Sequence, residues 1–249
     1  LNRLNSGPLA PIVNSVMRTA PVRAIMNRLL DIHPKRELPA FAAQPFTAWF
    51  RKHKPQTAQA QRRVVLFNDT FNTYNDPHIA IAATEVLEAS GHEVILPGHG
   101  CCGRPMMSNG LFDAAKSNAR DTIDKLAPYA LEGLPIVFLE PSCQSALMDD
   151  YFYLIPDHPN LQAVADQVCS FEEYMARLAN EGSLDLQFRD DERQILLHGH
   201  CHQKALVGTK PTHAALTLPA NYQIQEVDSS CCGMAGSFGY EAEHYDISM

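Results

Sequence analysis

Several features that would assign a class of protein at once are missing from this sequence. It has no apolar run of about eighteen residues and no stretch that resembles a signal peptide, so we expect no transmembrane segment. Its 249 residues carry 20 Lys and Arg against 28 Asp and Glu, and this shortage of basic charge argues against nucleic acid as a partner. We therefore expect a cytoplasmic protein whose association with a membrane, if there is one, is made through a partner.

What the sequence does contain is a repeated cysteine motif. The tripeptide Cys-Cys-Gly occurs at positions 101–103 and 231–233 and holds four of the seven cysteines. Cys101 follows Thr70 by 31 positions, and Cys231 follows Cys201 by 30. Thr70 and Cys201 each come shortly after an apolar run typical of a β-strand. Matched spacing of this kind indicates a duplicated unit that brings distant cysteines together in each half.

Adjacent cysteines restrict the possible chemistry. Neighbouring Cα atoms lie about 3.8 Å apart, below the range of roughly 4.4 to 6.8 Å usual for a disulfide, so a structural bond within each pair is disfavoured. Three interpretations stay open: buried thiols, a redox pair, and thiolate ligands to a metal. An iron–sulfur cluster suits such pairs because two thiolates can reach different irons. Cys169, which lies in an apolar helical pattern, is interpreted as a packed core thiol.

The hydrophobic pattern from residue 64 onward predicts alternating strands and helices. This alternation is typical of an α/β fold, here duplicated parallel-sheet (Rossmann-like) units with helices on both faces. We predict a Pro-rich helical connector arm over 1–62, a first cysteine-rich half over 63–182 and a second half over 183–249. The expected strands are 64–68, 93–97, 135–140, 194–197 and 223–227, and the expected helices are 77–90, 109–127, 161–179 and 203–207.

The ends of strands predict where a ligand would bind. Ligands of parallel sheets gather beyond the carboxyl ends of the strands, and Thr70, Cys101 and Cys143 each follow such an end. Cys143 lies 42 positions after Cys101, so the repeat predicts a matching cysteine near position 273. The sequence also begins without Met. We therefore expect an excerpt of a longer protein, truncated within the second half.

These residues resemble a known family. The chain is similar, over about residues 64–249, to the cysteine-rich domain found in heterodisulfide reductase, in the iron–sulfur component of glycolate oxidase and in the C-terminal region of FAD-linked oxidases, the last being the nearest match. The motifs that carry the resemblance are Asp69-Thr70-Phe71-Asn72, Cys101-Cys102-Gly103-Arg104-Pro105, Glu140-Pro141-Ser142-Cys143, His198-Gly199-His200-Cys201-His202-Gln203-Lys204-Ala205 and Cys231-Cys232-Gly233-Met234-Ala235-Gly236-Ser237-Phe238-Gly239.

The resemblance implies part of an FAD-dependent oxidoreductase. In such proteins an upstream flavin domain oxidises a 2-hydroxy acid such as D-lactate, glycolate or D-2-hydroxyglutarate, and the electrons leave through iron–sulfur centres. It implies a 4Fe-4S type cluster in the intact protein, possible loss of that cluster from an isolated fragment, and FAD bound upstream rather than in this chain. The implied partners are FAD and ferredoxin-like domains of the same chain or complex, and an electron acceptor.

The first half departs from the family pattern. Thr70 and Glu140 stand where relatives have cysteines, and Cys101, Cys102 and Cys143 remain. We therefore expect the metal site in the second half, built from Cys201, Cys231, Cys232 and a cysteine beyond the end, with the first-half set as the less favoured ligands. Reduction of a disulfide at a cluster of this module is therefore not expected. Glu140 could be an oxygen ligand, but it is expected to pair with Arg104.

Three further residues are assigned to the predicted site. His200 and His202 flank Cys201 and would act as ligands or as hydrogen-bond donors to sulfur. Gly233 would let the backbone pass close to a bulky group. Two other functions stay open: a zinc-binding structural or docking domain using the second-half cysteines with a histidine, and a metal-free domain whose thiols pack or exchange disulfides.

Overall fold

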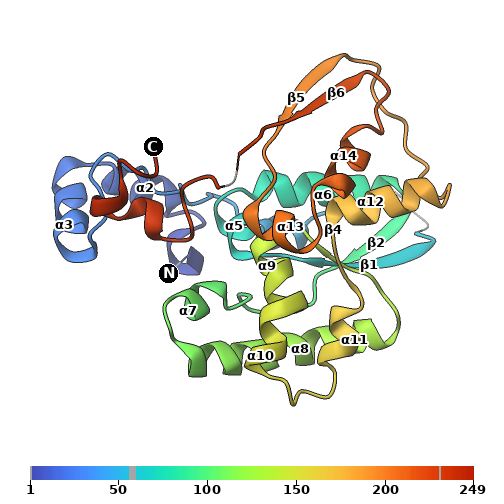
Figure 1. The fold of residues 1–249 in the computed structure, drawn as a ribbon, viewed down its shortest axis with the longest axis horizontal. Helices are drawn as coiled ribbons and strands as arrows, with labels where there is room; N and C mark the ends of the chain where they lie inside the picture. The colour runs from blue at the N-terminus through green and yellow to red at the C-terminus, as the bar shows by residue number, and fades with distance from the viewer. Residues whose placement is uncertain (1, 56–59, 230) are drawn as a thin grey trace. The chain divides into compact units, whose positions relative to one another are not determined.

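The structure is a computed structural model that describes residues 2–55, 60–229 and 231–249 (Figure 1). It divides into two compact units. The smaller unit combines Leu1–His53, Thr70–Ile79 and Ser229–Met249, and the larger unit combines Lys54–Asp69 with Ala80–Asp228, apart from the residues outside the described ranges. These units are defined by which residues pack together. The predicted halves, 63–182 and 183–249, are defined by the repeated motifs in the sequence, and this division stays a prediction.

A four-stranded parallel sheet forms the centre of the larger unit. Its order is β2-β1-β3-β4. Val65 of β1 lies between Ile95 and Ile136, and Ile136 in turn pairs with Val168. A parallel sheet is covered on both faces, which explains why the apolar residues of β1 are fully buried. The strands are β1 (Arg62–Phe67), β2 (His92–Ile95), β3 (Ile136–Phe138) and β4 (Val168–Ser170).

Helices cover both faces of this sheet, as predicted. Figure 1 shows α8 and α11 on one side and α6 and α12 on the other. Buried side chains of α8, including Ile123 and Leu126, pack in one core with Phe67 and Phe138 of the sheet. The helices are α6 (Pro77–Ala89), α7 (Arg104–Ser108), α8 (Phe112–Leu131), α9 (Pro141–Ser145), a π-helical turn over Ala146–Asp150, α10 (Tyr151–Leu154), α11 (Leu161–Ala165) and α12 (Phe171–Asn180).

The predicted helix over 161–179 is wrong. Helix α11 ends at Ala165, the chain adds β4 to the edge of the sheet, and α12 begins at Phe171. A capping box starts α12, because the Ser170 hydroxyl accepts from the Glu173 N–H at 3.0 Å and the Glu173 carboxylate accepts from the Ser170 N–H at 2.7 Å. A short apolar run does not distinguish strand from helix. Cys169 therefore lies in a strand, where it is buried as predicted.

A second, two-stranded parallel sheet belongs to the later part of the larger unit. It pairs β5 (Arg193–Leu197) with β6 (Tyr222–Glu226). The connection between them contains α13 (Cys201–Leu206) and α14 (Lys210–Leu216), and α14 packs on α12. The strand–helix–parallel strand order occurs in both halves of the chain, which confirms the predicted α/β class.

The smaller unit consists of short helices joined by bends, as its prolines predict. Its N-terminal and C-terminal segments pack together: the His33 N–H donates to the Tyr240 carbonyl at 2.8 Å, and the His33 ring stacks on Tyr245. Across the described residues, no helix combines the length and apolar character needed to cross a membrane. The elements are α1 (Asn2–Asn5), α2 (Ala10–Met17), α3 (Ala20–Leu30), α4 (Phe46–Phe50), α5 (Thr70–Tyr74) and the 3-10 turns Phe238–Tyr240 and Ala242–His244.

Candidate thiol and histidine site

The three cysteines of the first half meet at the carboxyl edge of the four-stranded sheet. Cys101 and Cys102 lie in the loop between β2 and α7, and Cys143 lies in α9, directly after β3. The Sγ atoms of Cys143 and Cys102 are in hydrogen-bond contact, 2.9 Å apart. Cys102 and Cys143 are buried, and Cys101 is partly exposed. Thr70, predicted to join them, begins α5 of the smaller unit.

Backbone contacts hold this loop in place. The Tyr151 hydroxyl donates to the Cys102 carbonyl at 2.7 Å, and the Asn118 side-chain amide donates to the Cys101 carbonyl at 2.5 Å. Gly103 has a φ of +83°, in the left-handed region, and a Cβ there would lie 3.2 Å from the Asn118 amide nitrogen. Glycine is therefore required at this position for two reasons, the backbone conformation and the close approach of Asn118.

The buried thiols are uncharged at neutral pH. A hydrogen bond from Cys101 lowers the pKa of Cys102, but its bond with Cys143 and its burial outweigh this effect and raise the pKa. The bond with Cys102 lowers the pKa of Cys143. Burial and the nearby carboxylates of Asp69 and Glu140 outweigh this effect, so the pKa of Cys143 is also raised. Removing a thiolate from water is costly, which explains the net direction in both cases.

The charged residues next to the thiols are paired differently from the prediction. Arg104 forms an ion pair with Asp150, not with Glu140. Glu140 instead caps α9, accepting from the Ser142 N–H at 3.2 Å and from the Ser142 hydroxyl at 2.7 Å. The predicted pair is wrong because the turn of α9 supplies local donors to Glu140, while the π-helical turn brings Asp150 to Arg104.

The histidines of the second-half motif contact the first-half motif. The Nδ1 atom of His202 lies 3.0 Å from the Ser145 hydroxyl, which also accepts from the Arg104 guanidinium at 2.9 Å. His200 caps α13 by accepting from the His202 N–H at 3.2 Å, and its Nε2 lies 3.9 Å from a Glu140 oxygen. Burial lowers the pKa of His202, as do Arg104 and His200, so its ring is neutral at pH 7.

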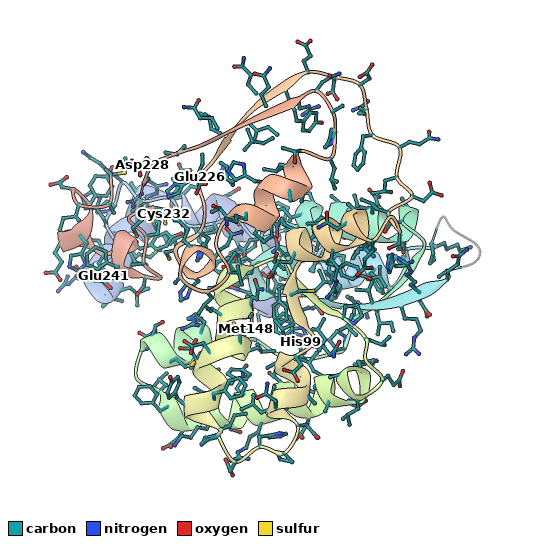
Figure 2. All side chains as sticks on the ribbon, turned by 45° about the vertical axis from the view of Figure 1, so that its right-hand side comes forward. His99, Met148, Glu226, Asp228, Cys232 and Glu241 are labelled. Atoms are coloured by element: carbon teal, nitrogen blue, oxygen red, sulfur yellow. The ribbon has the colours of Figure 1, made fainter. Side chains whose placement is uncertain are left out.

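The second-half cysteines are exposed. Cys201 begins α13, with its sulfur 4.0 Å from His200 Nδ1. Cys231 and Cys232 belong to the smaller unit, and Figure 2 labels Cys232 in the segment that follows β6. Gly233 has a φ of +79° and donates its N–H to the Cys231 sulfur at 3.4 Å. Because Cys201 and the pair belong to different units, the predicted ligand set stays a prediction.

The Cys102 and Cys143 sulfurs lie closer together than two thiolate ligands of a single metal ion. Two thiolates on one tetrahedral ion with bonds of about 2.3 Å would lie about 3.8 Å apart, further than the 2.9 Å between Cys102 and Cys143. A metal ion could also be held where at least three His, Cys, Asp or Glu side chains bring one ligand atom each within 4.8 Å of the others. Within the described ranges, Glu241, Glu243 and His244 form such a group. These three are close neighbours in sequence on the surface of the smaller unit.

The edge of the sheet also shows residues that sequence reasoning missed. Tyr151, Asn118, Ser145 and Asp150 all contact the motifs, and no spacing in the sequence marks them. His99, labelled in Figure 2, stacks on Phe67 with ring centroids 3.6 Å apart, and burial lowers its pKa to about 4.

A Cys-Cys-Gly loop and its thiols at the carboxyl edge of a parallel sheet define a cysteine-rich α/β domain. Residues 67–148 match the family named CCG, described as a cysteine-rich domain, and this confirms the resemblance deduced from the motifs. Over these residues the chain is similar to the CCG family. No solved structure matches it.

Curated relatives extend the similarity over most of the chain. A component of the anaerobic glycerol-3-phosphate dehydrogenase of Escherichia coli (strain K12) is 30% identical over 98% of this chain and 61% of its own length. "D-2-hydroxyglutarate dehydrogenase" of the same strain is 25% identical over 77% of this chain and 18% of its own length. "Lactate utilization protein A 1" of Bacillus cereus (strain AH820) is 25% identical over 71% of this chain and 74% of its own. The chain thus spans about three fifths of the glycerol-3-phosphate dehydrogenase component.

Proposed function

We propose that this chain is an iron–sulfur electron-transfer module of an FAD-linked dehydrogenase. The observation that carries the proposal is the similarity of 98% of the chain to a dehydrogenase component, together with the CCG match over residues 67–148, which contain Cys101, Cys102 and Cys143. The flavin and its substrate would bind in another domain or another chain of the complex. The electrons would leave this module for a separate acceptor, and the complex would be cytoplasmic, with any membrane contact made by a partner.

The substrate class follows from the names of the relatives. Two of those names concern 2-hydroxy acids, D-2-hydroxyglutarate and lactate, and one concerns glycerol-3-phosphate. All three compounds carry an alcohol close to an anionic group. We therefore widen the expected substrate from a 2-hydroxy acid to a small anionic alcohol, whose hydride the FAD accepts.

The proposed cluster ligands are Cys201, Cys231 and Cys232, with a fourth cysteine supplied by the full-length protein. These thiols are exposed and so remain accessible to a cluster, in contrast to the buried thiols of the first half. Cysteine thiolates are the usual ligands of 4Fe-4S clusters, which transfer single electrons. His200 and His202 would act beside the ligand sulfurs, as further ligands or as hydrogen-bond partners, and Gly233 would leave room beside them.

Iron analysis of variants tests this assignment. The natural full-length protein is purified anaerobically, and its iron, acid-labile sulfide and visible spectrum are measured. We expect Cys231→Ser to lose about four irons and four sulfides relative to the parent protein. Cys169→Ser changes a buried thiol remote from the motifs in sequence and serves as the matched control, with unchanged iron.

Two results would reject the proposal. One is a Cys231→Ser protein that retains all the iron of its parent. The other is zinc in place of iron in the parent protein, lost on the same substitution, which would instead support a structural domain. Using the difference between parent and variant removes the contribution of clusters held by other domains.

A further inference from the structure

We propose that Cys102 and Cys143 form a reversible disulfide, so that the first half of the chain is a two-electron thiol/disulfide site. The two residues are 41 positions apart and come from different segments, the loop after β2 and the start of α9. Their sulfurs are nevertheless 2.9 Å apart. A disulfide bond of about 2.05 Å requires the sulfurs to approach by only about 0.9 Å.

The surrounding structure holds the pair together before any bond forms. The Tyr151 hydroxyl fixes the Cys102 carbonyl, and the Cys143 N–H donates to the Glu140 carbonyl at 3.0 Å in the first turn of α9. Cys102 is 3% exposed and Cys143 is 6% exposed. Thiols on fixed backbones at this distance have a high effective concentration for one another.

The other uses of these thiols fit the geometry less well. Ligation of one tetrahedral ion would separate the sulfurs to about 3.8 Å, and the Glu140 carboxylate is engaged in the cap of α9. The buried Cys169 differs, because its sulfur contacts a backbone carbonyl at 4.0 Å and the Arg177 guanidinium at 3.9 Å. The contact of two buried thiols therefore distinguishes Cys102 and Cys143 from an ordinary packed cysteine.

The redox step balances with a small disulfide as oxidant. The S–H bonds of Cys102 and Cys143 break and one S–S bond forms between them. The oxidant receives the two electrons and two protons and is cleaved into two thiols. In reducing compartments a disulfide of this kind is transient, which suits a redox function better than a structural one.

Disulfide mapping tests the proposal. The natural full-length protein is equilibrated anaerobically in mixtures of 2-mercaptoethanol and 2-hydroxyethyl disulfide, a small uncharged probe that can reach a buried pair during local opening. The samples are quenched in acid, unfolded and alkylated, and the cysteine peptides are identified by mass spectrometry. We expect a Cys102–Cys143 cross-link that increases with the proportion of disulfide, while Cys169 stays alkylated throughout.

Variants separate this site from the proposed cluster. Cys101→Ser should retain the cross-link, whereas Cys143→Ser should abolish it without changing the iron content. A loss of iron in Cys143→Ser would overturn the proposal by making Cys143 a ligand. Full alkylation of Cys102 and Cys143 in the parent protein at every ratio, or a cross-link through Cys101 instead, would also overturn it. None of these results depends on whether Cys231 is a cluster ligand.

Discussion

Tyr151→Phe is expected to destabilise the protein by removing one buried hydroxyl group. Tyr151 is completely buried, and its hydroxyl donates to the Cys102 carbonyl at 2.7 Å. Phenylalanine keeps the ring and its packing but leaves that carbonyl without this donor. An unsatisfied buried polar group costs about 1–3 kcal/mol, so the free energy of unfolding should fall by about that amount.

Equilibrium unfolding in urea, followed by circular dichroism under reducing conditions, measures this loss. With a dependence of about 2 kcal/mol per molar urea, the midpoint should fall by roughly 0.5–1.5 M. Tyr153→Phe is the matched control, because Tyr153 lies in the same helix but is 83% exposed. Its free energy of unfolding should change by less than about 0.5 kcal/mol.

Equal changes in the two variants would refute this reasoning. Such a result would mean that the Tyr151 hydroxyl contributes no more to the free energy of unfolding than the solvent-exposed Tyr153 hydroxyl. It would also mean that the position of the Cys102 loop does not depend on this hydrogen bond. A larger loss in Tyr151→Phe, with the slope of the urea dependence unchanged, would confirm that the effect lies in stability and not in the compactness of the unfolded state.

Three further predictions concern the same unit. Ser170→Ala should lower the free energy of unfolding by about 1 kcal/mol in urea titrations, because it removes the N-cap of α12. Burial raises the pKa of Cys169 to about 12, so the free energy of unfolding of the parent protein should fall as the pH rises above about 9. In Cys169→Ala this free energy should fall less steeply with pH than in Cys201→Ala, the control at an exposed thiol. Burial lowers the pKa of His92, so the free energy of unfolding should also fall as the pH drops below about 6.5. In His92→Gln this decrease toward low pH should be less steep, and an equally steep decrease would contradict the assignment.

The local sequence was enough to predict most of the α/β pattern. The apolar run after Arg63 is β1, and the helix predicted from Pro77 is α6, because a buried strand and an N-terminal proline have signals within a few residues. For the short run at 168–170 the sequence pattern predicts a helix, whereas the structure has β4 there. Only pairing with β3 makes it a strand, and that pairing depends on a partner more than thirty positions away.

The candidate site divides in the same way. The Cys-Cys-Gly loops, their spacing and the family resemblance came from the sequence alone, because each motif is a short stretch whose residue types are its signal. The contact of Cys102 with Cys143, the pairing of Arg104 with Asp150 and the contact of His202 with Ser145 were decided by the tertiary structure. Each joins side chains 41 to 57 positions apart, and the strand register and the crossover helices set which of them meet.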